Sequence, residues 1–132
     1  MNTESTEKTL VDNKLTEKVI GCAIKVHSEL GPGLLESAYE ECLFYELSKS
    51  GIHVEKQKAL PLKYYDVFLE CGYRVDLLVE NQLIVEIKAC ESITDVHKAQ
   101  VLTYLKLSGC KLGLLINFNV KLLTNGLKRL IL

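Results

Sequence analysis

Residues 73–90, which read YRVDLLVENQLIVEIKAC, constrain the fold more than any other part of the chain. Two runs of apolar and β-branched residues flank a polar turn at residues 80–82, and this pattern predicts an antiparallel β-hairpin. With the turn at that place, residues whose numbers sum to about 162 face each other across the hairpin. Asp76 is then expected opposite Glu86, with the two Cβ atoms about 5 Å apart.

The alternation of side chains along a strand divides this hairpin into two predicted faces. Asp76, Glu86 and Lys88 share one face with Arg74. The other face is expected to be apolar and consists of Tyr73, Val75, Leu77, Val79, Leu83, Val85, Ile87 and Ala89. A half-exposed antiparallel sheet also has one charged, solvated face, so this pattern alone leaves a structural and a catalytic interpretation open.

The catalytic interpretation follows from the chemistry of the charged face. Two facing carboxylates repel each other and raise the pKa of one of them unless a cation lies between them. Oxygen ligands of this kind suit Mg²⁺ or Mn²⁺, which bind one or two carboxylates together with waters and phosphate oxygens. Lys88 points the same way as Glu86 and can orient or deprotonate a water. Together these groups predict a phosphodiester hydrolysis site.

The composition limits the classes of protein that the chain can belong to. A length of 132 residues with 48% hydrophobic and 25% charged residues predicts one folded domain. No apolar run approaches the roughly 20 residues that span a bilayer, and the polar N-terminus is not a signal peptide, so we expect a cytoplasmic protein without a membrane segment. A net charge of −1 argues against a strong overall attraction to nucleic acid. The five cysteines form no CxxC pair, which argues against structural zinc.

The order of predicted elements is two helices, several strands, a third helix, a strand and a C-terminal hairpin. Residues 1–12 are polar and expected to be disordered, which leaves residues 13–132 as one domain. Apolar residues at helical spacing predict helices over residues 15–30, 34–49 and 94–109. Residues 111–118 read as a buried strand, and Asn125-Gly126 is typical of a tight hairpin turn.

The run GPGLLESAYEECLFYEL contains Gly33, Glu36 and Tyr39, in the spacing G-x-x-E-x-x-Y. Together with VDLLVE, VEIKA, QVLTYLKLSG and LGLLINFNV, this run resembles the GxxExxY protein family, a branch of the PD-(D/E)xK nuclease superfamily. The resemblance extends from about Leu15 to the C-terminus. It implies an α/β fold with a restriction-endonuclease-like core, in which helices flank a central mixed β-sheet.

The resemblance also implies roles for individual residues. Its metal ligands correspond to Asp76, Glu86 and the backbone carbonyl of Ile87, while Val75 replaces the proline of the superfamily motif. The remaining catalytic positions correspond to Lys88, Glu36, Gln100 and Tyr104. Gln100 and Tyr104 are four residues apart on one helical face and are expected to point at the charged side of the hairpin, although a polar pair in a helix–sheet interface has the same spacing.

The sequence therefore leads to a first hypothesis and two alternatives. The first is a Mg²⁺- or Mn²⁺-dependent nuclease whose partner is nucleic acid, with DNA favoured over RNA. The second is a nuclease-like module that has lost turnover and binds nucleic acid or another protein. The third is a structural role in a homodimer formed through the edge of the C-terminal hairpin.

Overall fold

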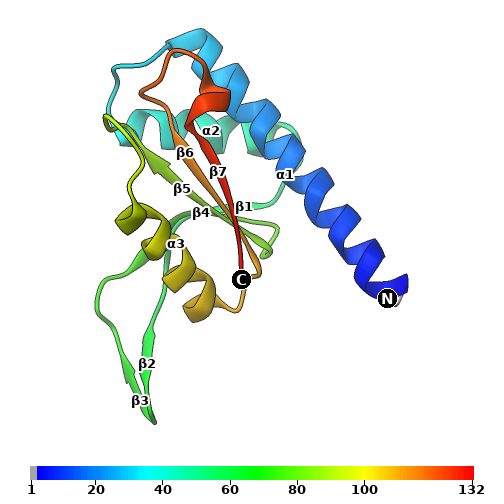
Figure 1. The fold of residues 1–132 in the computed structure, drawn as a ribbon, viewed down its shortest axis with the longest axis vertical. Coiled ribbons are helices and arrows are strands. Elements are labelled where there is room, and N and C mark those ends of the chain that lie inside the picture. The colour runs from blue at the N-terminus through cyan, green and yellow to red at the C-terminus, as the bar shows by residue number, and fades with distance from the viewer. Residues whose placement is uncertain (1–2) are drawn as a thin grey trace.

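The computed structural model describes residues 3–132, with the side chains described from residue 13 onward. Its centre is a five-stranded sheet in the order β1 (Val54–Ala59), β4 (Arg74–Val79), β5 (Leu83–Lys88), β6 (Leu112–Asn117) and β7 (Leu127–Ile131) (Figure 1). Strands β5 and β6 are parallel, and the other neighbouring pairs are antiparallel. The predicted central mixed sheet flanked by helices is confirmed.

Helices cover both faces of this sheet. On one face, α1 (Thr3–Leu30) and α2 (Glu36–Lys49) bury a cluster that includes Val19, Ala23, Leu43, Leu47, Leu77, Val79, Leu83, Val85, Leu114 and Ile116. On the other face, α3 (Asp95–Ser108) covers a cluster that includes Val75, Leu78, Ile84, Val101, Leu105 and Leu115. The helix α3 connects the parallel strands β5 and β6, as a parallel pair requires a crossover.

This arrangement corrects the prediction of one apolar and one charged face for the hairpin of β4 and β5. Leu78 and Ile84 are buried against α3, so the second face is covered rather than solvated. Val75, which we expected beside Leu77, lies in the cluster under α3, so the alternation is broken at Asp76 between them. Because helices cover both faces of these strands, ordinary ion pairing at the surface does not explain the charged residues in them.

The first helix has wider bounds than the sequence predicted. It runs from Thr3, whereas the apolar spacing predicted a start at Leu15. Residues 1 and 2 lie outside the described residues. The disorder of residues 1–12 and the boundary of the domain at residue 13 stay predictions. Over the described residues, no helix combines the length and the apolar character needed to cross a membrane.

Tyr39 fixes the turn between α1 and α2. Its hydroxyl donates to the carbonyl of Gly31 at 2.6 Å and accepts from the backbone N–H of Leu34 at 3.1 Å. Its fully buried ring stacks on Phe118, with 4.4 Å between the ring centroids. The tyrosine of the G-x-x-E-x-x-Y motif therefore holds α2 in place against the sheet and does not reach the candidate site.

The ends of α3 agree closely with the prediction. Thr94 is the N-cap, and its side chain accepts a hydrogen bond from the backbone N–H of His97. The Nδ1 atom of His97 in turn accepts from the backbone N–H of Thr94 at 3.0 Å. Gly109 ends the helix in the left-handed conformation, with φ of 78°. His97 is therefore a capping residue at the start of the helix.

The C-terminal strand pair is present, but its connection differs from the prediction. Strands β6 and β7 pair antiparallel from Leu112↔Ile131 to Ile116↔Leu127. Asn125 and Gly126 lie in the 3₁₀ helix η1 (Leu123–Gly126), at the end of a longer connection, and do not form a two-residue turn. At Gly126 an added Cβ would collide with the backbone carbonyl of Asn117, so the glycine permits a close approach of two backbone segments.

A small hairpin projects from the body between β1 and β4 (Figure 1). It consists of β2 (Leu62–Tyr64) and β3 (Val67–Leu69), which pair only with each other. The pairing of Tyr64 with Val67 places a two-residue turn at Tyr65-Asp66. We call residues 60–73 the arm.

Replacement of Gly126 tests the close approach at the end of β6. Gly126→Ala is expected to lower the free energy of unfolding by about 1–3 kcal/mol, because the new methyl group forces the backbone of Asn117 to move. Gly21→Ala, in the middle of α1 with no atom near the added Cβ, is the control and is expected to be neutral or stabilising. Equal urea midpoints for the two variants would contradict the assignment.

Candidate active site

Asp76 and Glu86 each bind the backbone of the opposite strand. The paired positions of β4 and β5 are Leu77↔Val85, Leu78↔Ile84 and Val79↔Leu83, which confirms the predicted register. Beyond these pairs, Oε1 of Glu86 accepts from the backbone N–H of Asp76 at 3.0 Å. In return, Oδ2 of Asp76 accepts from the backbone N–H of Ile87 at 2.8 Å. The two carboxylates therefore lie together where the regular pairing of the strands ends.

The carboxyl group of Glu86 has a strongly raised pKa. Its side chain is in the buried core, with the residue only 4% exposed. Burial, followed by the negative charge of Asp76, raises the pKa of the Glu86 carboxyl to about 8. The hydrogen bond from the Asp76 backbone and the positive charge of Lys88 oppose this rise but do not cancel it. Without a cation, the carboxyl group of Glu86 is protonated at neutral pH.

Lys88 connects the carboxylates to α3. Its Nζ donates to Oε1 of Gln100 at 3.3 Å, and Nε2 of Gln100 donates to the hydroxyl of Tyr104 at 3.2 Å. Burial, followed by the negative charge of Glu86, raises the pKa of the Tyr104 hydroxyl. The structure therefore brings the Gln100 and Tyr104 pair to the same end of the sheet as Lys88 and Glu86.

Glu36 contacts the end of the strand that carries Glu86 and Lys88. Its Oε1 accepts from the backbone N–H of Ala89 at 3.3 Å, directly after Lys88. Glu36 is the first residue of α2, so its carboxylate also lies at the positive end of the helix dipole. In this structure the side chain binds the end of β5 rather than the two facing carboxylates.

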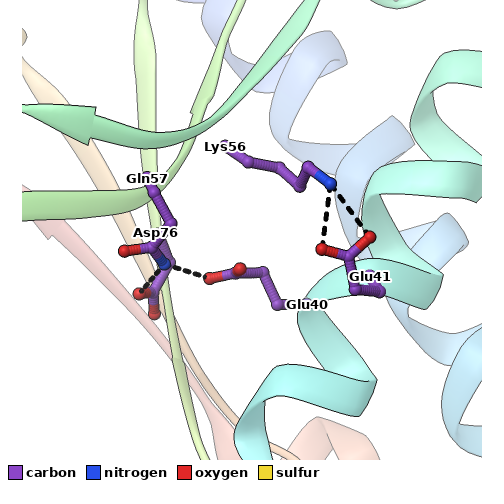
Figure 2. A network of polar contacts seen from close by, with 5 residues as sticks. All are labelled: Glu40, Glu41, Lys56, Gln57 and Asp76. Atoms are coloured by element: carbon purple, nitrogen blue, oxygen red, sulfur yellow. Dashed lines mark hydrogen bonds and ion pairs between the residues drawn. The ribbon is translucent and has the colours of Figure 1, made fainter.

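The acidic residue of α2 that reaches Asp76 is Glu40, which the sequence analysis missed. A single amide group, Nε2 of Gln57, donates to Oε1 of Glu40 at 2.6 Å and to Oδ1 of Asp76 at 3.2 Å (Figure 2). Burial, which outweighs the bond from Gln57, and the negative charge of Asp76 raise the pKa of the Glu40 carboxyl. Glu40 follows Glu36 by four residues, so the helical spacing was the signal that could have found it.

Gln57 occupies an unusual backbone position for a residue inside a strand. Its φ of 51° lies in the left-handed region, between the regular pairs Lys56↔Leu77 and Lys58↔Val75. A conformation of this kind costs of order 1–3 kcal/mol and persists where the surroundings fix it. The strained backbone therefore belongs to Gln57, the residue whose side-chain amide bridges the carboxylates of Glu40 and Asp76.

An ion pair beside this bridge attaches β1 to α2. Nζ of Lys56 lies 2.9 Å from both carboxylate oxygens of Glu41, and 4.5 Å from the centre of the Phe44 ring (Figure 2). The pair is partly exposed, so its contribution to stability is small. It lies next to the Gln57 bridge and joins the same two elements.

The arrangement of donors fits a hard divalent cation that retains waters. Within residues 13–132, no group of three or more His, Cys, Asp and Glu side chains is placed so that it could hold a metal ion by itself. Asp76 and Glu86, with Glu40 nearby, nevertheless offer only oxygen atoms, and burial together with the negative charge of Asp76 raises the pKa of Glu40 and Glu86. Mg²⁺ commonly binds through one or two carboxylates and completes its shell with waters and phosphate oxygens.

The backbone of Ile87 also faces Asp76. Its N–H donates to Asp76, while the carbonyl of Lys88 accepts from Phe118 on the opposite side of β5. The hydrogen-bonding groups of successive residues in a strand point to alternate sides. The carbonyl of Ile87 therefore points to the side on which Asp76 lies.

Comparison with known protein families places this arrangement in context. A family model described as the PD-(D/E)XK nuclease superfamily matches residues 13–130. No curated protein and no solved structure matches the chain. The matched range contains every element that contributes a side chain to the candidate site.

The pH dependence of stability tests the electrostatics of Glu86. Between its ordinary value of 4.5 and the value of about 8 in the folded protein, the folded state binds more protons than the unfolded state. The free energy of unfolding in the presence of a chelator is therefore expected to fall, by a few kcal/mol, as the pH rises from 5 to 8. Urea unfolding at intervals of pH measures this decrease.

Two variants isolate the contribution of Glu86. Glu86→Gln has the same shape without the titration and is expected to remove most of the decrease. Glu17→Gln, at an exposed position on α1, is expected to retain it. If Glu86→Gln kept the full decrease between pH 5 and 8, another group would be responsible.

Proposed function

Because the chain belongs to the PD-(D/E)XK nuclease superfamily, we propose that it is a metal-dependent nuclease that hydrolyses phosphodiester bonds of nucleic acid. The observation that carries the proposal is the meeting of Asp76, Glu86 and Lys88 at one end of the sheet, inside a partly buried, negatively charged environment. The G-x-x-E-x-x-Y motif at residues 33–39 supports assignment to the GxxExxY branch of the superfamily.

The carboxylates of Asp76 and Glu86, with the carbonyl of Ile87, would hold the metal ion, which we propose to be Mg²⁺ or Mn²⁺. Such an ion supplies a water of lowered pKa and neutralises charge on the phosphate. Glu40 adds a further carboxylate beside Asp76 and is proposed to contribute to the same site through a water or directly. Glu36 instead positions the chain after Lys88 through its bond to Ala89.

Lys88 is proposed to orient the attacking water and to attract the phosphate. The amide of Gln100 accepts a hydrogen bond from Nζ of Lys88 and thereby fixes the direction of the ammonium group. The hydroxyl of Tyr104 holds that amide in turn by accepting a hydrogen bond from its Nε2. Gln100 and Tyr104 therefore act by positioning Lys88, whereas Lys88 itself acts at the reacting atoms.

A specific observation favours the second hypothesis, a nuclease-like binding module without turnover. Both carboxylate oxygens of Asp76 already accept hydrogen bonds from the protein, one from Ile87 and one from Gln57. A metal ion at Asp76 has to compete with these donors. Measurement of metal binding therefore separates the two functions: Mn²⁺ binding that Asp76→Asn abolishes supports the enzyme, and no binding supports the module.

Substitution of Lys88 tests the catalytic proposal. Lys88→Ala is expected to reduce cleavage of DNA or RNA in Mg²⁺ or Mn²⁺ by about 10²–10⁴-fold, since a positioned acid–base group contributes a factor of that size. Cleavage of labelled oligonucleotides of both kinds measures the effect and shows which nucleic acid is the substrate. Lys106→Ala, at an exposed position of α3, is the matched control. Undiminished cleavage by Lys88→Ala would refute the assigned role.

The two glutamates of α2 can be distinguished by their effect on metal affinity. Glu40→Gln is expected to weaken Mn²⁺ binding more than Glu36→Gln, because Glu40 shares the amide of Gln57 with Asp76, whereas Glu36 binds the backbone of Ala89. Calorimetric titration of the folded variants measures the affinities. Glu41→Gln, the neighbouring residue whose carboxylate is bound to Lys56, is expected to leave them unchanged. The reverse order of the first two variants would restore the role that the sequence assigned to Glu36.

A further inference from the structure

Several large apolar side chains of the arm are exposed to solvent. Tyr64, Tyr65 and Phe68 are 63%, 81% and 69% exposed, and Val67 between them is also exposed. Four of the nine aromatic residues of the chain lie in the arm, with Tyr73 as the fourth. An isolated two-stranded hairpin is only marginally stable by itself, so a concentration of exposed rings on such an element indicates a binding surface.

The pairing of β2 with β3 divides the arm into two faces. Leu62 faces Leu69 and Tyr64 faces Val67, which places these apolar side chains on one face. Lys63 faces Phe68 on the other, where Nζ of the lysine lies 5.6 Å from the centre of the ring. Tyr65 stands at the tip, with its ring 4.8 Å from that of Tyr64 in an edge-to-face arrangement.

The arm is continuous with the candidate site. It leaves β1 two residues after Gln57 and enters β4 two residues before Asp76. At its root, the ring of Tyr73 lies 6.3 Å from that of Tyr104, which belongs to the site. A cavity of about 330 Å³ at the same place is lined by Leu60, Pro61, Glu70, Tyr73 and Arg74, among others. The exposed rings of the arm, the cavity at its root and the carboxylate of Asp76 therefore follow one another along this part of the chain.

We propose that the arm binds the unpaired bases of a single-stranded segment of nucleic acid and thereby presents the adjoining phosphodiester to the site; this rests on the proposed function. Aromatic rings stack on the flat faces of bases, and these faces are accessible only in unpaired strands. Lys63 on the arm and Arg74 directly after it supply positive charge for phosphates, beside the acidic residues Asp66 and Glu70. The root cavity has the size of a small-ligand pocket and fits one nucleotide.

A second copy of the chain is the less suitable occupant. A stable interface between proteins involves about 20–30 residues on each side. The exposed apolar residues of the arm are far fewer, and they are divided between two faces and a tip. Stacking on bases needs only one ring for each base, which matches the small size of the arm.

The experiment measures binding in the 132-residue chain that carries Lys88→Ala, so that the probe stays uncut. Fluorescence anisotropy of a labelled single-stranded DNA oligonucleotide gives the affinity, and the same oligonucleotide annealed to its complement serves as the duplex. Tyr65→Ala and Phe68→Ala are each expected to weaken binding of the single strand by at least about fivefold. Tyr45→Ala is the matched control, because this tyrosine is 61% exposed but lies on α2, outside the arm.

Hydrolysis of an oligonucleotide of tetrahydrofuran abasic units in Mn²⁺ separates the arm from the proposed function, since this substrate has phosphodiester bonds but neither bases nor other aromatic rings. With Lys88 restored, the arm variants are expected to hydrolyse it as the unsubstituted protein does, whereas Lys88→Ala is not. If Lys88→Ala hydrolysed this substrate as well as the arm variants do, the result would contradict the nuclease function. The binding assay tests the arm independently of that function.

Four results would overturn the proposal. They are no binding of the single strand by the parent protein, unchanged affinity in both arm variants, equal affinity for single strand and duplex, and a dimer in sedimentation that the arm variants dissociate while their oligonucleotide affinity stays the same. The last result would assign the arm to contact between copies of the chain.

Discussion

The structure depends on the exchange of hydrogen bonds between the carboxylates of Asp76 and Glu86 and the backbones of the opposite strands. In a continuous antiparallel ladder, backbone carbonyls would take the N–H groups of Asp76 and Ile87. Carboxylates take them instead, so the strands remain joined while two acidic side chains are held at a fixed place inside the protein. The same two contacts thus stabilise the end of the sheet and concentrate negative charge there.

The rest of the site is built around that charge. Gln57 supplies a neutral donor between Glu40 and Asp76, and Lys88 supplies a positive charge that acts on Glu86. Neither fully compensates the buried carboxylates, since the pKa values of Glu40 and Glu86 remain raised. A buried carboxyl group with a raised pKa is typical of a functional site, because a cation bound beside it would favour its charged form.

Local patterns in the sequence predicted those features that local rules determine. The turn at residues 80–82 and the alternation of apolar residues were enough to predict the register that brings Asp76 to Glu86, and helical spacing was enough to predict the bounds of α3 to within one residue. Glu40 was missed because helical spacing shows that Glu36 and Glu40 share a face, but not how α2 is turned against the sheet. Val75 was placed on the wrong face because strict alternation takes no account of the distortion at Gln57 and Asp76. Asn125-Gly126 was misread because a close backbone contact and a tight turn require the same glycine.

The carboxylates that meet at the site come from α2, β4 and β5, which are separated along the chain and joined only by the completed fold. No short segment of the unfolded chain reproduces their arrangement, because the parallel pairing of β5 with β6 and the packing of α2 both involve residues distant in sequence. A ligand that requires this arrangement binds the native state alone. Its binding energy is therefore added to the stability of the whole protein, which couples occupancy of the site to resistance against unfolding.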